Sequence, residues 1–185
     1  MLDRAACERR VYRLATLLTG TPLVATRVIT AVVDAQPDLR NLDDAHIDRL
    51  TVLRAREVRG GGMIVDPRVP VPVAQALADL PGQAREAWVL GHVYRLEPRA
   101  LARAMDCSRT AALRHLDQAQ AALTPAEEAA NALRAYAATL EVPAFYRDAR
   151  RRRRWRRLVV RICVALVAAA GCVVLAGWWW SRRAG

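Results

Sequence analysis

Residues 98–123 read PRALARAMDCSRTAALRHLDQAQAAL, and this stretch decides the fold. Proline is favourable at the first position of a helix, and serine is a good N-cap. The pattern therefore predicts one helix over Pro98–Met105 and a second one from Ser108 to Leu123. Only Asp106 and Cys107 separate them, and Asp106 is a residue that tolerates a left-handed turn. A helix, a tight turn and a helix of this size make up the helix-turn-helix arrangement.

The second predicted helix has two distinct faces. Its apolar stripe of Ala112, Leu116, Ala119 and Leu123 is expected to face inward. In a helix-turn-helix, the first residues of the second helix enter the major groove of DNA. We therefore expect DNA contacts from Ser108, Arg109, Thr110, Leu113, Arg114 and His115.

The rest of the chain before residue 143 also follows helical patterns, so the expected fold class is all-α. Residues 3–57 predict two or three helices, with a break at Gly20-Thr21-Pro22. Glycine and proline make residues 59–72 a linker. Short helices are expected over 73–79 and 83–94. Thr124-Pro125-Ala126-Glu127 reads as a capping box that opens a helix ending before Pro143.

The positive charge of the chain is concentrated in its tail. The net charge is +11, and all 29 basic residues are arginine. Residues 1–146 hold 18 Arg against 17 Asp and Glu, whereas residues 147–185 hold 11 Arg and one acid, Asp148. The overall basicity is therefore no evidence that the folded part binds DNA.

A membrane helix is predicted near the C-terminus. The 19 residues Ile162–Trp180 carry no charge, and as a helix they would span about 28 Å, close to the hydrocarbon thickness of a bilayer. Eight arginines precede the run and two follow it, so the positive-inside rule places the N-terminal part in the cytoplasm. The buried core helix is the alternative reading. The expected membrane-interface residues are Arg150, Arg151, Arg152, Arg153, Arg154, Trp155, Arg156, Arg157, Trp178, Trp179 and Trp180.

A small-residue row of Ala168, Cys172 and Ala176 predicts a homodimer through the membrane helix.

Together these patterns predict seven segments. The segments are an N-terminal helical domain (1–58), the linker (59–72), a helix-turn-helix domain (73–123), a connecting helix (124–142), an arginine-rich juxtamembrane segment (143–157), the membrane helix (158–180) and an extracytoplasmic stub (181–185).

Residues 80–123 carry a series of short motifs. These are Leu80-Pro81, Arg85-Glu86, Trp88-Val89-Leu90, Leu96, Leu101-Ala102, Cys107-Ser108, Leu116, Ala119 and Ala121-Ala122-Leu123. In this order, and colinear without a gap, they resemble the fourth conserved region of extracytoplasmic-function sigma factors of bacterial RNA polymerase. Residues 12–25 are similar to the opening of that family's second region.

The resemblance implies promoter DNA and RNA polymerase core as partners, but the chain departs from the family at two functional elements. The polymerase-docking helix of the family is acidic, whereas Thr26–Val33 contains no acid. No aromatic residue lies between Tyr12 and Trp88 to capture a base during promoter melting. We therefore expect weak polymerase binding and poor initiation by the chain alone. We also expect weak DNA binding, because Leu113, Asp117, Gln118 and Gln120 stand where the family usually carries basic residues.

Two function classes remain open from the sequence. The first is a bacterial, membrane-anchored, sigma-factor-like transcription regulator that binds DNA. The second is a sigma-like module that docks another regulator or polymerase at the membrane, with Leu113 in its contact patch. An enzyme is not expected, because His46, His92 and His115 are isolated, and neither a metal site nor a cofactor is predicted from the four cysteines or the glycines.

Overall fold

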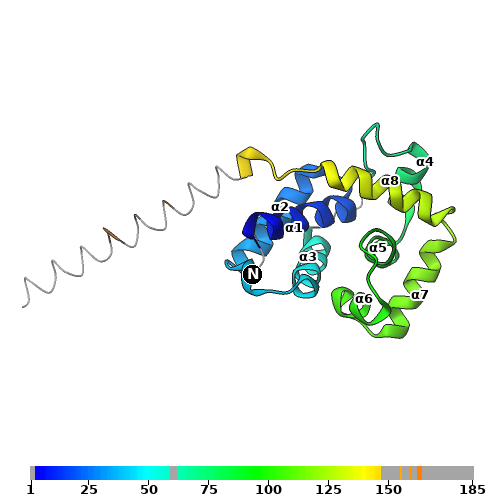
Figure 1. Cartoon of the computed structure of the whole chain (residues 1–185), viewed down its shortest axis with the longest axis horizontal. Coiled ribbons are helices and arrows are strands. Elements are labelled where there is room, and N and C mark those ends of the chain that lie inside the picture. Colours follow the sequence, from blue (N-terminus) through cyan, green and yellow to red (C-terminus); the bar gives the residue numbers. More distant parts are fainter. Residues whose placement is uncertain (1–2, 59–61, 147–154, 156–158, 160–161, 164–185) are drawn as a thin grey trace, which may run out of the picture. The chain divides into compact units, whose positions relative to one another are not determined.

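A computed structural model describes residues 3–58, 62–146, 155, 159 and 162–163. Every regular element in these residues is helical, which confirms the predicted all-α class for this part of the chain (Figure 1). The elements are α1 (Arg4–Thr19), α2 (Pro22–Ala35), the 3-10 turn η1 (Leu39–Asn41), α3 (Asp44–Val58), α4 (Val71–Asp79), α5 (Gly82–Trp88), η2 (Val89–Val93), α6 (Pro98–Met105), α7 (Arg109–Gln120) and α8 (Ala126–Thr139).

The break between α1 and α2 lies where the sequence predicts it. Gly20 ends α1 in the left-handed region at φ 79°, and its N–H donates to the Thr16 carbonyl at 2.8 Å. Thr21 caps α2, and Pro22 occupies its first turn. The backbone of Gly62 lies so close that a Cβ on Gly20 would stand 1.8 Å from the Gly62 oxygen. Glycine at position 20 thus allows both the turn and the close approach of the chain after α3.

The chain between α3 and α4 is anchored by two buried side chains. Ile64 is 2% exposed and Val69 is 3% exposed. Arg68 lies over the Tyr136 ring and donates to the Thr139 hydroxyl at 2.7 Å. The glycine- and proline-rich composition correctly predicts a lack of regular structure over 62–70, and α4 begins two residues earlier than expected, at Val71.

The helix predicted over 83–94 changes its winding at Trp88. From Val89 to Val93 the backbone is a π-turn, in which the Tyr94 N–H donates to the Val89 carbonyl at 3.1 Å. A Cβ on Gly91 would stand 3.0 Å from Leu116, so α7 packs closely against this turn. Arg95 follows in the left-handed region at φ 54°, a conformation that glycine adopts more easily.

The capping box predicted at Thr124–Glu127 is wrong. The Thr124 hydroxyl donates to the Gln120 carbonyl at 3.3 Å, so it points back to α7 and caps nothing in α8. Helix α8 begins after Pro125 without a side-chain cap, and its first turn carries Glu127 and Glu128, which suit the positive end of the helix dipole.

Helix α8 lies across both α1 and η2 (Figure 1). Arg13 of α1 donates to the carbonyls of Leu140 and Ala138, at 3.1 and 2.7 Å, where the helix dipole is negative. Residues 1–142 therefore form one compact unit, and α3 packs on α6 within it. The predicted division into two domains at residues 59–72 stays a prediction.

Residues 143–185 form a second unit, of which little is described. Tyr146 is buried, and its N–H donates to the Pro143 carbonyl at 3.1 Å. Trp155 is 67% exposed. Within the described residues, no helix combines the length and the apolar character needed to span a bilayer.

Most of the predicted membrane helix 158–180 lies outside the described residues, as does the stub 181–185. The same holds for the small-residue row and for the interface residues other than Trp155, which are Arg150, Arg151, Arg152, Arg153, Arg154, Arg156, Arg157, Trp178, Trp179 and Trp180.

Candidate nucleic-acid interface

Helices α6 and α7 lie where the sequence predicts two helices separated by a tight turn. Asp106 ends α6 in the left-handed region at φ 55° and ψ 47°, and the Cys107 N–H donates to the Ala102 carbonyl at 3.0 Å. Ser108 then caps α7, accepting a hydrogen bond from the Ala111 N–H at 3.2 Å. The two residues of the turn and the serine cap therefore fix the direction in which α7 leaves α6.

The predicted contact residues separate into two groups on α7. Ser108, Arg109, Thr110 and Arg114 are exposed, and Leu113 is half-buried on the same side of the helix. His115 is also half-buried, but it faces a hollow of about 660 Å³ that it shares with Leu18, Arg56 and Gln118, among others. The outer face of α7 thus includes Arg109, Thr110, half-buried Leu113 and Arg114, and His115 lies apart from them.

The arginines of this motif differ from most others in the described part of the chain. Arginines elsewhere mostly bind carboxylates or main-chain carbonyls, as Arg10 and Arg134 do. Within the described ranges, those that make neither an ion pair nor a side-chain hydrogen bond are Arg9, Arg27, Arg99, Arg103, Arg109 and Arg114. Four of these six lie on α6 and α7. Their charges are therefore available to an anionic ligand.

Arg99 and Arg103 were missed from the sequence. Both are exposed on α6, and their spacing of four residues places them on one side of it. Their position in the first predicted helix could have indicated them, because the first helix of a helix-turn-helix crosses the DNA backbone.

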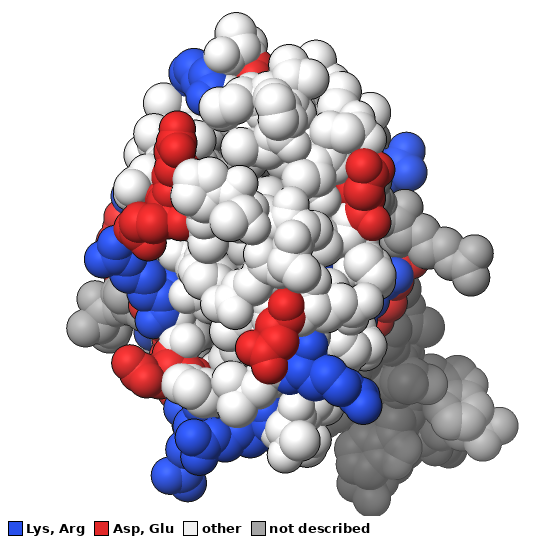
Figure 2. Space-filling view, turned by 90° about the vertical axis from the view of Figure 1, so that its right-hand side faces the viewer, with Lys and Arg blue, Asp and Glu red and all other residues white. Residues whose placement is uncertain are grey.

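The surface around α7 is unevenly charged. Figure 2 looks onto the end of the molecule that carries α7 in Figure 1, and the centre of this face is uncharged. Basic side chains gather along its lower edge, at the height where Figure 1 places α6 and the start of α7. The basic character is thus confined to the rim of a largely uncharged face.

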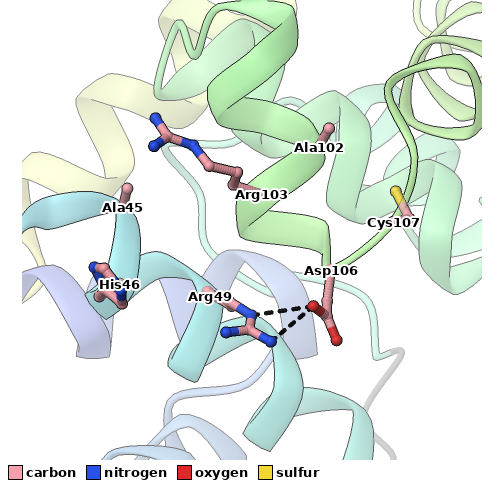
Figure 3. Close-up of a pocket in the computed structure, with 7 residues that line it drawn as sticks. All are labelled: Ala45, His46, Arg49, Ala102, Arg103, Asp106 and Cys107. Atoms are coloured by element: carbon pink, nitrogen blue, oxygen red, sulfur yellow. Dashed lines mark hydrogen bonds and ion pairs between the residues drawn. The ribbon is translucent and has the colours of Figure 1, made fainter.

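A hollow of about 420 Å³ lies between α3 and the turn of the motif, lined by residues of both elements (Figure 3). The Nε and Nη2 atoms of Arg49 both donate to Oδ1 of Asp106, at 3.1 and 2.8 Å. Arg103 points away from this pair. The lining residues are Ala45, His46, Arg49, Ala102, Arg103, Asp106 and Cys107.

Two ionisable groups at or beside this hollow have shifted pKa values. The backbone and side chain of His46 hydrogen-bond to Asp43 and lower the pKa of its carboxyl. Burial raises the pKa of the Cys107 thiol, which keeps the thiol protonated and a poor nucleophile. No group of three or more His, Cys, Asp or Glu residues that could hold a metal occurs in the described ranges.

Comparisons with known proteins returned nothing for this chain: no family model, no curated protein and no solved structure matches it.

Proposed function

We propose that this chain is a membrane-anchored, sigma-factor-like transcription regulator that binds duplex DNA through α6 and α7. The observation that carries the proposal is the set of unpaired arginines on a helix-turn-helix, Arg99, Arg103, Arg109 and Arg114. Phosphate neutralisation by such charges supplies much of the affinity for DNA. The order of the elements and the sequence pattern of residues 80–123 support the sigma-like assignment.

In this proposal the two helices have different roles. The exposed start of α7 enters the major groove, where Arg109 and Arg114 meet the flanking phosphates, while α6 crosses the backbone. Arg99 and Arg103 are then placed to meet phosphates. Asp117 on the outer face of α7 opposes the phosphates, so the binding is weak and strongly dependent on salt.

Membrane attachment is the second part of the proposal, and it rests on the uncharged run Ile162–Trp180 and its arginine flank. A cytoplasmic helix-turn-helix tethered in this way reaches DNA either in place or after proteolytic release.

A salt titration of DNA binding tests the proposal. The full-length chain in a neutral detergent is titrated with a labelled duplex, and the double variant Arg109→Ala/Arg114→Ala is compared with it. Each lost phosphate contact lowers the slope of log K against log salt by about 0.9, so the double variant should bind more weakly with a slope reduced by about two. The matched control is Arg9→Ala/Arg27→Ala, which removes two other unpaired charges from α1 and α2.

A protein-docking role is the second candidate, favoured by the uncharged face in Figure 2 and by half-buried Leu113 on the outer side of α7. It becomes the leading candidate if the wild-type chain binds no duplex even at low salt. Purified RNA polymerase core would then be tested as a partner, and Leu113→Asp should abolish that binding while Asp117→Asn leaves it intact.

A further inference from the structure

Three arginines join α1 and α3 to α5 and to the end of α6. Arg49 of α3 holds Asp106 in the turn of the motif. Arg56 of α3 donates to both carboxylate oxygens of Glu86, at 2.6 to 3.1 Å, and to the Met105 carbonyl at 2.9 Å. Arg85 of α5 donates in return to the Leu17 carbonyl at the end of α1, at 3.0 and 2.8 Å.

The two arginines of α3 lie seven residues apart and therefore share one face of the helix. Both bind groups at the end of α6: the Met105 carbonyl is its last helical carbonyl, and Asp106 ends it. Helix α3 thus contacts the helix-turn-helix at the point from which α7 departs.

The clasp, defined as Arg49 and Arg56 with their partners Asp106, Glu86 and Met105, has a weak and a strong end. The side chains of Arg49 and Asp106 are 46% and 48% exposed, so water and salt screen their attraction. The Glu86 side chain is only 8% exposed, so its pair with Arg56 is better shielded. The Arg49–Asp106 pair is therefore the weaker end, and breaking it leaves the hydrogen bond from Arg56 to the Met105 carbonyl in place.

In the proposed complex, a duplex bound to α6 and α7 would approach α3. An α-helix with its side chains is about 10–12 Å across and the major groove is about 12 Å wide, so α7 would fill the groove between two phosphate walls. One of these walls must cross α6. The exposed residues of α6 are Arg99, Arg103 and Asp106, and α3 stands beside two of them across the hollow of Figure 3.

We propose that α3 holds the helix-turn-helix in a closed state through the Arg49–Asp106 end of the clasp, and that DNA binding requires this end to open. The inference rests on the proposed function, since it describes how access to that site is regulated. Apparent affinity falls in proportion to the fraction of open molecules, so a variant that opens the clasp should bind more tightly.

The decisive variant is Arg49→Ala, because two possible roles of Arg49 predict opposite changes in the affinity for duplex DNA. If Arg49 closes the motif, its removal should tighten binding of a labelled duplex about two- to fivefold, with an unchanged salt slope. If Arg49 instead contacts phosphate, its removal should weaken binding and lower the slope by about one. The matched control is Arg54→Ala, which removes a charge from α3 that pairs only with Glu57 in the same helix.

The measurement uses the full-length chain in neutral detergent, with hydrogen exchange over residues 98–110 as a second readout. Tighter binding by Arg49→Ala together with faster exchange, neither of which Arg54→Ala shows, would support the closed state. Equal or weaker binding by Arg49→Ala would overturn it, and so would unchanged exchange.

Failure of the proposed function gives a different result. If neither the wild type nor Arg49→Ala binds duplex at low salt, DNA binding itself is refuted and the gating of DNA falls with it. Faster exchange in Arg49→Ala would then still show that the clasp exists, but it would control access of a protein partner.

Discussion

Replacement of Arg10 by alanine should be among the most destabilising single changes in the folded unit. Arg10 of α1 makes two hydrogen bonds of 2.8 Å to Asp48 of α3, one to each carboxylate oxygen. The Asp48 side chain is fully buried, whereas Arg10 retains 24% exposure. The guanidinium also lies 5.3 Å from the centre of the Tyr94 ring, so it connects α1, α3 and the segment before α6.

The expected loss follows from the burial of Asp48. Removing one partner of a buried ion pair leaves an uncompensated charge and typically costs about 3–5 kcal/mol. The matched control is Arg54→Ala, which breaks the more exposed pair with Glu57 and should cost about 0.5 kcal/mol or less. The double variant Arg10→Ala/Asp48→Asn also removes the buried carboxylate of Asp48, so it should be more stable than Arg10→Ala alone.

The assay is urea unfolding of the full-length chain in neutral detergent, followed by far-ultraviolet circular dichroism. Burial raises the pKa of the Asp48 carboxyl. A folded-state pKa above the unfolded value means that the stability of the protein falls as the pH rises. The loss in free energy of unfolding caused by Arg10→Ala should therefore become smaller as the pH is lowered from 8 to 5. A loss no larger than that of Arg54→Ala, with no dependence on pH, would refute the argument.

Two further predictions depend on local geometry, and a third depends on the arginines that flank the apolar run. Gly20→Ala should lower the free energy of unfolding by at least about 2 kcal/mol, because alanine would have to adopt a left-handed backbone and its Cβ would clash with the Gly62 oxygen. Gly82→Ala, with open space around the residue, should be neutral or slightly stabilising in the same urea experiment. The hydrogen bonds from Arg68 lower the pKa of Asp66 to about 2. This carboxyl therefore stabilises the fold above its ordinary pKa of 3.8 and loses that contribution as the pH falls toward 2. An NMR titration should show the low pKa, and Arg68→Ala should return it toward 3.8. A reporter active only outside the cytoplasm should work when fused after Gly185 and fail when fused before residue 150, and the opposite pattern would contradict the predicted topology.

Much of the local structure could be read from the sequence, because single residues restrict the backbone strongly. The break at Gly20-Thr21-Pro22, the start of α6 at Pro98, the left-handed turn at Asp106 and the cap at Ser108 all occur where they were predicted. Each depends on interactions within about four residues. The predicted capping box at Thr124 was wrong, because two local hydrogen bonds compete for one hydroxyl and the sequence does not show which of them is preferred.

The partners of the arginines were decided only by the tertiary structure. The chain has no lysine, so the type of residue does not separate Arg10, Arg49 and Arg85, which bind groups across the fold, from Arg109 and Arg114, which bind none in the described residues. Arg49 and Asp106 are 57 residues apart, and Arg85 reaches a carbonyl 68 residues away. Helical periodicity shows which face of a helix is polar, but the neighbour of that face is fixed by packing. Packing therefore determines which positive charges are neutralised and which are left for a ligand.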